Sequence, residues 1–129
     1  MTLPIEPVAW QRVKRGHTGA AYVPTKTRNF KNTVKYYASE FCINKLLKGP
    51  LRLTVRFILT RPRSITRRTP WKRPDLDNYM KALMDGLNGV LYADDAQIVE
   101  YGEGTGKYYA MDGSPGRIEL ILEEIGPER

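Results

Sequence analysis

An alternation of apolar and polar residues runs through residues 51–60, LRLTVRFILT, and only Ile58 departs from it. One face collects the apolar side chains of Leu51, Leu53, Val55, Phe57 and Leu59. Because successive side chains of a β-strand point to opposite faces of the sheet, the pattern predicts a strand that is buried on one side. Residues 97–104 and 107–125 have further strand-like sequence, and residues 112–116, DGSPG, are expected to form the turn between two of these strands.

Residues 25–47 have the periodicity of a helix. The apolar residues at helical spacing are Val34, Ala38, Phe41, Cys42 and Leu46. Gly49 and Pro50 are expected to end this helix, because a proline disfavours the helical conformation of the residue before it. Residues 1–24 contain three prolines and are expected to be extended or loop structure.

A second helix is predicted within residues 74–89. Its apolar stripe consists of Leu76, Met80, Leu83 and Leu87, which should face the core. Asp75 comes directly before the first helical residue and is expected to be its N-cap. Asp77 and Lys81 lie four residues apart beside the stripe, at a spacing that allows an ordinary exposed ion pair.

These elements predict one domain over residues 1–129. The expected fold class is α/β of the α+β type, with a small mixed, mostly antiparallel sheet and at least two helices. A chain of 129 residues can form one hydrophobic core and is too short for two ordinary domains. Hydrophobic residues make up 41% of the chain, but no run is long enough to span a bilayer, so we expect no membrane association.

The charged residues are distributed unevenly. Residues 1–73 contain seventeen Lys and Arg against two acids, and residues 74–129 contain four Lys and Arg against twelve acids, within a formal net charge of +7. Six of the basic residues lie in a predicted loop at residues 61–73. Such a distribution is expected of a protein that binds both a polyanion and cations. A mixed, solvated surface is the alternative.

Four carboxylates lie within one short segment of a chain whose formal net charge is +7, at Asp75, Asp77, Asp94 and Asp95. Their repulsion is costly unless a cation lies among them. The loop after the second helix is short enough to return the chain to the helix start, which would create an oxygen-rich pocket suited to Mg²⁺ or Mn²⁺. Neighbouring side chains of a strand point apart, so only one acid of the later pair is expected to bind the metal, and Asp95 is the candidate.

Such a pocket would suit phosphodiester hydrolysis. A divalent cation lowers the pKa of an attacking water, and Lys81 on the same helix face is expected to stabilise the charge that develops on phosphorus or the leaving oxygen. The predicted loop would bind backbone phosphates. Its candidate DNA-binding residues are Arg67, Arg68, Lys72 and Arg73.

The segment RPDLDNYMKALMDGLNGVLYADDAQI resembles the signature of the RusA family of Holliday-junction resolvases, which bacteria and prophages carry. The shared features are a Pro-Asp-x-Asp-Asn start, a lysine four residues after the second aspartate, and a later Asp-Asp-x-Gln. The resemblance implies a homodimeric, Mg²⁺-dependent endonuclease that binds four-way DNA junctions and resolves them by paired nicks in recombination and repair. It implies that the metal ligands are Asp75, Asp77 and Asp95, with Lys81 as the essential basic residue.

The resemblance leaves two positions open. The role of Asp94 is not assigned, and Trp71 lies slightly before the positions where some family members carry aromatic residues that help to open the junction. Two other functions are kept as alternatives: a DNA-binding module that organises branched DNA without cutting it, and a nuclease for linear duplexes or flaps. Cys42 is the only cysteine and fits a reducing cytoplasm, and the single histidine, His17, cannot supply a histidine metal cluster.

Overall fold

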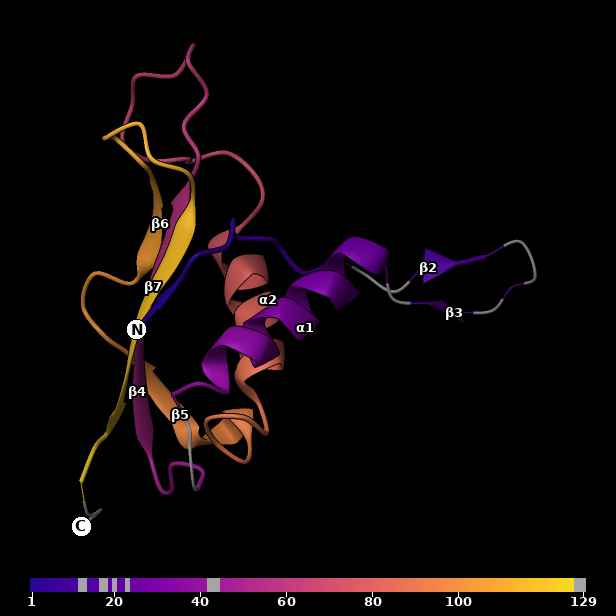
Figure 1. The fold of residues 1–129 in the computed structure, drawn as a ribbon, viewed down its shortest axis with the longest axis vertical. Coiled ribbons are helices and arrows are strands. Elements are labelled where there is room, and N and C mark those ends of the chain that lie inside the picture. The colour runs from indigo at the N-terminus through magenta and orange to yellow at the C-terminus, as the bar shows by residue number, and fades with distance from the viewer. Residues whose placement is uncertain (12–13, 17–18, 20, 23, 42–44, 127–129) are drawn as a thin grey trace.

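A five-stranded sheet and two helices make up the body of the protein in the computed structural model (Figure 1). The structure describes residues 1–11, 14–16, 19, 21–22, 24–41 and 45–126. The elements in chain order are β1 (Thr2–Leu3), β2 (Lys14–Arg15), β3 (Ala21–Tyr22), α1 (Thr25–Ala38), β4 (Leu51–Leu59), α2 (Leu76–Leu87), the 3₁₀ helix η1 (Asp95–Gln97), β5 (Ile98–Tyr101), β6 (Gly106–Tyr109) and β7 (Arg117–Glu124). His17 and Cys42 lie outside the described residues.

The sheet is built around β4. This strand pairs antiparallel with β7 along all eight residues of β7, and β1 extends the sheet beyond β7 in the antiparallel sense. On the other side of β4, β5 and β6 pair parallel to it, one after the other along its length. The sheet is therefore mixed and mostly antiparallel, which confirms the predicted α+β class.

The predicted turn at residues 112–116 lies between two strands, as expected, although the two strands are not neighbours in the sheet. The segment does connect β6 to β7, but these two strands lie on opposite sides of β4 and do not pair with each other. The connection therefore crosses the end of β4. Local turn residues indicate where a chain reverses, but not which strand comes to lie between its two arms.

Both helices cover the same face of the sheet (Figure 1). The predicted alternation in β4 is confirmed, since Leu51, Leu53, Val55 and Phe57 are fully buried against the helices. The stripe of α2 is likewise buried at Met80, Leu83 and Leu87, with Leu76 packed at its edge. The helices approach closely at Gly86, where a Cβ atom would lie only 2.6 Å from the Cβ of Val34. The core thus fixes α2, and with it the charged face beside its stripe.

The prediction for the end of α1 is wrong. The helix ends at Ala38 rather than near Leu47, and Phe41 is 54% exposed instead of contributing to the core. Leu47 forms an isolated parallel bridge with Tyr92, and its amide donates to the carbonyl of Leu91 at 2.8 Å. This pairing requires extended backbone. It therefore replaces the last turns of the predicted helix.

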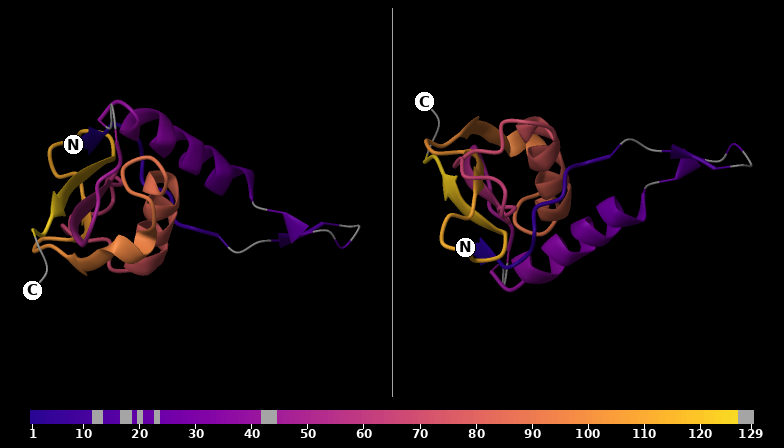
Figure 2. Two further views of the ribbon diagram at one scale, coloured as in Figure 1. Left: turned by 90° about the horizontal axis from the view of Figure 1, so that it is seen from below. Right: turned by 90° about the horizontal axis from the view of Figure 1, so that it is seen from above.

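The pair β2–β3 projects from the body as a separate two-stranded ribbon (Figure 2). It belongs to the N-terminal part of the chain that was expected to be extended. Within the described part of the chain, neither helix has the length and apolar character needed to cross a membrane.

Candidate functional site

A pocket of about 350 Å³ opens along α2, between this helix and the segment that runs through η1 and β5. Its charged lining residues are Asp77, Lys81, Asp85 and Asp95. Asp77, Lys81 and Asp85 follow one another at intervals of four residues, so they form a row along one face of the helix. The pocket therefore brings together three of the four predicted catalytic residues, because Asp95 arrives from the other side.

Asp95 is fixed by a buried tyrosine. After α2 the chain turns at Gly89, which has a φ of 79°, and Tyr92 follows with no exposed surface. The phenol of Tyr92 donates a hydrogen bond of 2.9 Å to Oδ1 of Asp95. Burial and, after it, the bond to Asp95 raise the pKa of Tyr92, so the hydroxyl remains a donor. The carboxylate of Asp95 is thus held at the pocket.

Asp94 does not line the pocket and caps the following turn. Its Oδ1 accepts from the amide of Ala96 at 3.0 Å. Gln97 completes the capping box, because its Oε1 accepts from the amides of Ala93 at 2.9 Å and Asp94 at 3.1 Å. The Asp-Asp-x-Gln sequence therefore contains one acid at the pocket and two residues that shape the turn.

The amide of Gln97 also ties this turn to the segment before β4. Its Nε2 donates to the carbonyl oxygens of Leu47 and Gly49, both at 3.1 Å. The turn is thereby attached to the same segment that bridges to Tyr92. Asp95 is consequently positioned by contacts on both sides of it in the sequence.

Lys81 is held by an aromatic ring. Its Nζ lies 3.8 Å from the centroid of Trp10, and no ion pair with Asp77 is found within the described part of the chain. The amide of Trp10 donates to the carbonyl of Asn78 at 2.8 Å, which anchors the N-terminal segment to α2 one turn before Lys81. The ordinary ion pair considered for Asp77 and Lys81 is therefore replaced by a cation–π contact.

Asp75 occupies the N-cap of α2, as predicted, but its side chain makes no capping hydrogen bond. The carboxylate is exposed and does not line the pocket with Asp77 and Asp95. It stands two residues before Asp77, where the basic loop joins the helix. The structure thus brings two of the three predicted metal ligands to the pocket, and the third lies outside the pocket lining, at the start of α2.

The donor set has the chemistry that a magnesium ion requires, since every acidic group around the pocket is a carboxylate and Mg²⁺ prefers oxygen ligands. Within the described residues, no group of three or more Asp, Glu, His and Cys side chains converges closely enough to hold a metal ion. The metal site at Asp75, Asp77 and Asp95 therefore stays a prediction.

Tyr101 reports on the charge of the site. This residue lines the pocket from β5, and its pKa is raised first by burial and then by the negative charges of Asp77 and Asp95. Both carboxylates thus act on the same phenol although one belongs to α2 and the other to η1. Asp77 and Asp95 therefore both lie near Tyr101 at the pocket.

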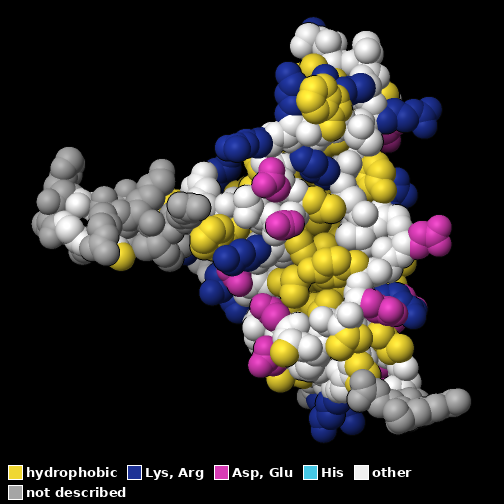
Figure 3. All heavy atoms as spheres, turned by 180° about the vertical axis from the view of Figure 1, so that it is seen from behind, with side chains coloured by type: hydrophobic (Ala, Val, Ile, Leu, Met, Phe, Trp, Pro, Cys, Tyr) yellow, Lys and Arg dark blue, Asp and Glu magenta, His cyan; other side chains and the backbone are white. Residues whose placement is uncertain are grey.

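The predicted basic loop lies between β4 and α2, next to the N-terminal end of the helix (Figure 1). Its candidate DNA-binding residues are all on its surface or partly exposed: Arg67, Arg68, Lys72 and Arg73. Trp71 is 67% exposed, and its ring contacts the guanidinium of Arg67 at 5.2 Å and the ammonium of Lys72 at 5.4 Å. Figure 3 shows basic side chains gathered over the upper part of the molecule and acidic side chains along the middle of the same face.

Lys107 of β6 attaches the loop to the sheet. Its Nζ donates to the carbonyl oxygens of Lys72 at 2.8 Å and Pro74 at 2.7 Å. The amide of Tyr109 donates to the carbonyl of Arg68 at 2.8 Å, which holds the middle of the loop as well. The basic loop is therefore connected at two points to the strand beside it, rather than extending freely from the start of α2.

The sequence assigned no role at the site to Trp10, Asp85 or Tyr92, and Gln97 appeared only as part of the Asp-Asp-x-Gln motif. Asp85 had a visible signal, because it continues the four-residue spacing of Asp77 and Lys81. Gln97 stands in the capping-box position relative to Asp94. Trp10 had no sequence signal, since its contact joins segments far apart in the chain.

The comparisons with known proteins bear on this arrangement. The model of the family "Endodeoxyribonuclease RusA" matches residues 4–122, nearly the whole chain. The chain is also similar to "Uncharacterized protein YqaN" of Bacillus subtilis (strain 168), with 28% identity over 135 residues, which cover 93% of this chain and 92% of that protein. The family match spans both helices, the basic loop and the pocket with Asp77, Lys81 and Asp95. The chain belongs to the RusA family of endodeoxyribonucleases.

Proposed function

We propose that this protein is a Mg²⁺-dependent endonuclease that resolves four-way DNA junctions by paired nicks, in recombination and repair. One observation carries the proposal. In a chain of the RusA family, Asp77 and Lys81 of α2 and Asp95 of η1 line a single pocket, and the basic loop lies at the start of the same helix. A pocket that combines acids with a lysine beside a basic surface suits hydrolysis of a phosphodiester.

In this proposal Asp77 and Asp95 hold the divalent cation from opposite sides of the pocket, and Asp75 joins them from the start of α2. When bound, the cation supplies a water of lowered pKa and neutralises charge on the phosphate oxygens. Tyr92 keeps Asp95 in place through its hydrogen bond of 2.9 Å. Asp85 adds negative charge to the same pocket and favours a cation there.

Lys81 acts on the phosphate. Its ammonium lies against Trp10 at the pocket, where it can stabilise charge on the phosphate or the leaving oxygen. A cation over a ring face retains donors on its other side, so the contact with Trp10 leaves Lys81 able to bind an anion. Stabilising charge that develops during the reaction accelerates cleavage more than it strengthens binding.

The basic loop binds the phosphates on either side of the cut. Arg67, Lys72 and Arg73 stand on the segment that leads into α2, and contacts to phosphate position a duplex without reading its sequence. Trp71 offers an exposed ring beside two of these cations, which suits stacking on an unpaired base at the junction centre.

A homodimer completes the proposal. One 129-residue domain with one pocket cuts one strand, whereas a symmetric junction needs two cuts related by a two-fold axis. Two identical subunits supply these cuts with one site each.

The substrate is chromosomal or phage DNA, so we propose that the protein acts in the cytoplasm of a bacterium.

A second function is favoured by one observation, the lack of a converging group of three metal-binding side chains among the described residues. It is a protein that binds and organises branched DNA without cutting it. The two functions share the basic loop and differ only at the pocket. An assay that records binding and cleavage separately therefore distinguishes them.

The test uses a four-way junction with each strand labelled in turn, together with a linear duplex and a flap of the same sequence. Wild-type protein is incubated with each DNA in Mg²⁺, in Mn²⁺ and in EDTA, and binding is measured in EDTA. We expect paired, symmetric nicks in the junction with Mg²⁺ or Mn²⁺, and binding alone in EDTA. Junction binding without cleavage in either metal would establish the non-catalytic function instead.

Asp75→Asn and Asp77→Asn test the assigned residues in the same assay. Each should reduce cleavage by on the order of 100-fold or more while junction binding persists. Asp112→Asn is the matched control, because Asp112 is an exposed acid of the loop between β6 and β7. If the two site variants cut as fast as wild type, the pocket is not the active site.

A further inference from the structure

A second groove, of about 440 Å³, lies between α1 and α2. Three basic side chains of α1 line it, Arg28, Lys31 and Lys35, and the α2 side contributes Asp85. The proposed nuclease function makes no use of this groove. Its excess of positive charge identifies it as a candidate anion site.

The charge of α1 is one-sided. The helix sequence TKTRNFKNTVKYYA contains four basic residues and no acid. Arg28, Lys31 and Lys35 follow the spacing that places side chains on one helix face, whereas Lys26 lines a different pocket, on the other flank of α1. Seven residues of helix rise about 10 Å, which matches the axial rise of about three nucleotides in one strand of a duplex. The row is thus suited to following a sugar-phosphate backbone.

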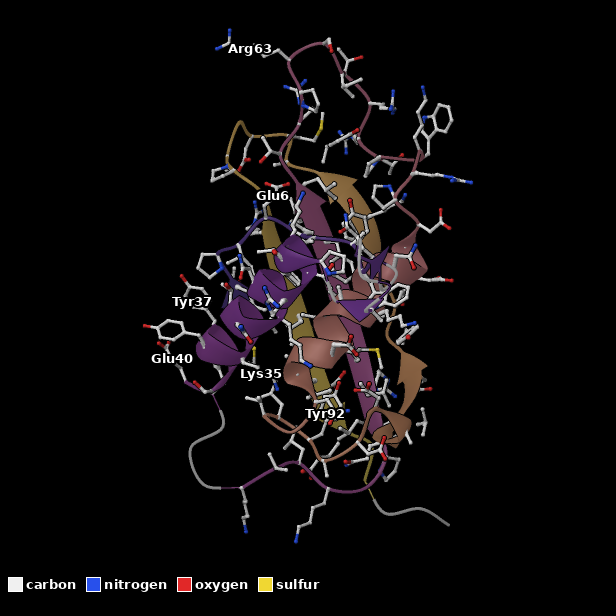
Figure 4. All side chains as sticks on the ribbon, turned by 90° about the vertical axis from the view of Figure 1, so that its right-hand side faces the viewer. Glu6, Lys35, Tyr37, Glu40, Arg63 and Tyr92 are labelled. Atoms are coloured by element: carbon white, nitrogen blue, oxygen red, sulfur yellow. The ribbon has the colours of Figure 1, made fainter. Side chains whose placement is uncertain are left out.

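The basic groups are available to bind an anion. Arg28 and Lys31 are exposed, and neither forms an ion pair with any described residue. Lys35, labelled in Figure 4, donates to the carbonyl of Asn88 at 3.4 Å, which directs its ammonium toward α2. A lysine ammonium has three donors, so two of them are left for another acceptor.

A buried hydroxyl provides an independent observation. Thr27 lines the groove and is only 6% exposed, and its Oγ1 has no hydrogen-bond partner among the described residues. A buried polar group without a partner is unfavourable. An anion entering the groove would offer an acceptor next to it.

The groove lies next to the proposed catalytic pocket. Asp85 lines both of them, and Trp10 lines the groove while its ring contacts Lys81 of the pocket. The basic loop lies near the N-terminal end of α2, whereas Lys35 and Asn88 mark the C-terminal end of this helix. The groove itself follows the α1 side of α2 at Ala82 and Asp85, so one basic surface lies beyond the N-terminal end of the pocket and the other lies beside it.

We propose that the groove between α1 and α2 binds the sugar-phosphate backbone of a duplex arm of the junction, through Arg28, Lys31 and Lys35. The proposal rests on the proposed function for the identity of the DNA. With the basic loop at one end of the pocket and this groove beside it, the DNA is held on two sides of the pocket. The strand that crosses the pocket is then fixed near Lys81.

The experiment compares two double variants that remove the same charge. Arg28→Ala/Lys31→Ala removes two cations from the groove. Lys26→Ala/Lys48→Ala removes two exposed cations, one from the other flank of α1 and one from the loop before β4. Binding of a labelled four-way junction is measured in EDTA, without cleavage, from 50 to 300 mM salt. Circular dichroism and thermal unfolding establish that each variant is folded.

We expect the groove variant to bind about tenfold more weakly near 0.1 M salt. The slope of log affinity against log salt should fall by about two, because two phosphate contacts are lost. The control should stay within about twofold of wild type. Equal weakening of the two variants, or no weakening of either, would contradict the proposal that the groove binds DNA. If the groove variant binds the junction more weakly but the wild-type protein cuts no junction, the proposed nuclease function is contradicted. DNA binding by the groove is then still supported.

Discussion

Lys81 is the residue on which the chemistry of the pocket depends most. Lys81 is exposed, and at such a site a cation over an aromatic face is worth about 0.5–1 kcal/mol, at least as much as an exposed ion pair at about 0–1 kcal/mol. The ammonium accordingly lies 3.8 Å from the Trp10 centroid, and no ion pair with Asp77 is found in the described part of the chain. The carboxylate of Asp77 is therefore left free to face the pocket.

Lys81→Ala should reduce the cleavage rate by on the order of 100-fold while the junction dissociation constant changes by less than about threefold, because the charge matters most in the transition state. Single-turnover cleavage and binding in EDTA measure the two quantities. Lys107→Ala is unsuitable as a control, since this lysine holds the basic loop. Lys26→Ala removes an exposed cation elsewhere and should leave both quantities unchanged. Equal losses in rate and affinity would make Lys81 a simple phosphate contact.

Trp10 is expected to position Lys81. Trp10→Leu should slow cleavage about tenfold with little change in junction binding, and Trp10→Phe should restore most of the rate because a ring remains beneath the ammonium. A double-mutant cycle with Lys81→Ala is the decisive measurement. If Trp10 acts through Lys81, Trp10→Leu has no further effect once the lysine is gone. Additive losses would show that Trp10 acts on the DNA or on the fold instead.

Tyr92 connects the candidate site to the pH dependence of the protein's stability. Burial and the bond to Asp95 raise its pKa, so the folded protein favours the neutral phenol. The unfolded chain loses this proton first as the pH rises above about 10. The stabilisation is therefore complete below that pH and is lost as the pH rises beyond it.

Tyr92→Phe should lower the free energy of unfolding by about 1 kcal/mol at pH 8, because a hydrogen bond to a carboxylate is removed. The difference from wild type should shrink toward pH 11, by up to about 1.4 kcal/mol per pH unit, because phenylalanine does not titrate. Urea unfolding followed by circular dichroism at pH 8, 9, 10 and 11 gives both curves. A difference that is the same at every pH would contradict the assignment.

At the scale of elements, the 3₁₀ turn η1 determines where Asp95 points. Gln97 closes the capping box with Asp94 and donates to two carbonyl oxygens of the segment before β4. Gln97→Ala should lower the free energy of unfolding by about 2 kcal/mol, because the cap and both of these bonds are lost. It should also slow cleavage, since the turn that holds Asp95 is loosened.

Chemical denaturation and junction cleavage measure the two effects. Gln11→Ala is the control, because Gln11 is exposed in the N-terminal segment. A variant at position 97 that is destabilised yet cuts at the wild-type rate would show that the turn contributes to stability alone.

The local pattern was sufficient for the elements whose burial is periodic. The strand at Leu51–Leu59 and the helix at Leu76–Leu87 were predicted nearly to the residue, since each has one continuous apolar face. The helix of α1 was predicted too long, because Leu47 pairs with Tyr92, 45 residues further on, and no periodicity reports such a contact. Nor did the sequence indicate that β6 and β7 lie on opposite sides of β4.

The residues of the candidate site also divide into those that the sequence predicted and those that it did not. Asp77, Lys81 and Asp95 were identified from spacing and family resemblance, and the fold brings all three to one pocket. Asp75 was expected among them and lies outside the pocket lining, at the start of α2. Trp10 and Tyr92 could not be assigned in advance, because one acts through a ring contact across the fold and the other through a hydrogen bond at the end of a turn.

At the scale of the whole molecule, the uneven distribution of charge along the sequence corresponds to separate basic and acidic surfaces. The basic loop precedes α2, the acidic pocket runs along this helix, and the groove lies beside the pocket on the α1 side. A polyanion that is held on two sides of an acidic pocket lies close to carboxylates, which would repel it in the absence of a cation. A divalent cation in the pocket offsets this repulsion, and the proposed requirement for Mg²⁺ therefore follows from the arrangement of charge as well as from the chemistry.

The central claim is that the pocket containing Asp95 cuts DNA, and two adjacent acids test it most directly. Asp95 faces the pocket, whereas Asp94 caps η1, a role that asparagine performs about equally well. The measurement is the single-turnover rate of four-way junction cleavage in Mg²⁺ by Asp95→Asn and Asp94→Asn. We predict a loss on the order of 100-fold or more for Asp95→Asn and a rate within about threefold of wild type for Asp94→Asn. Equal rates for the two variants would contradict the claim.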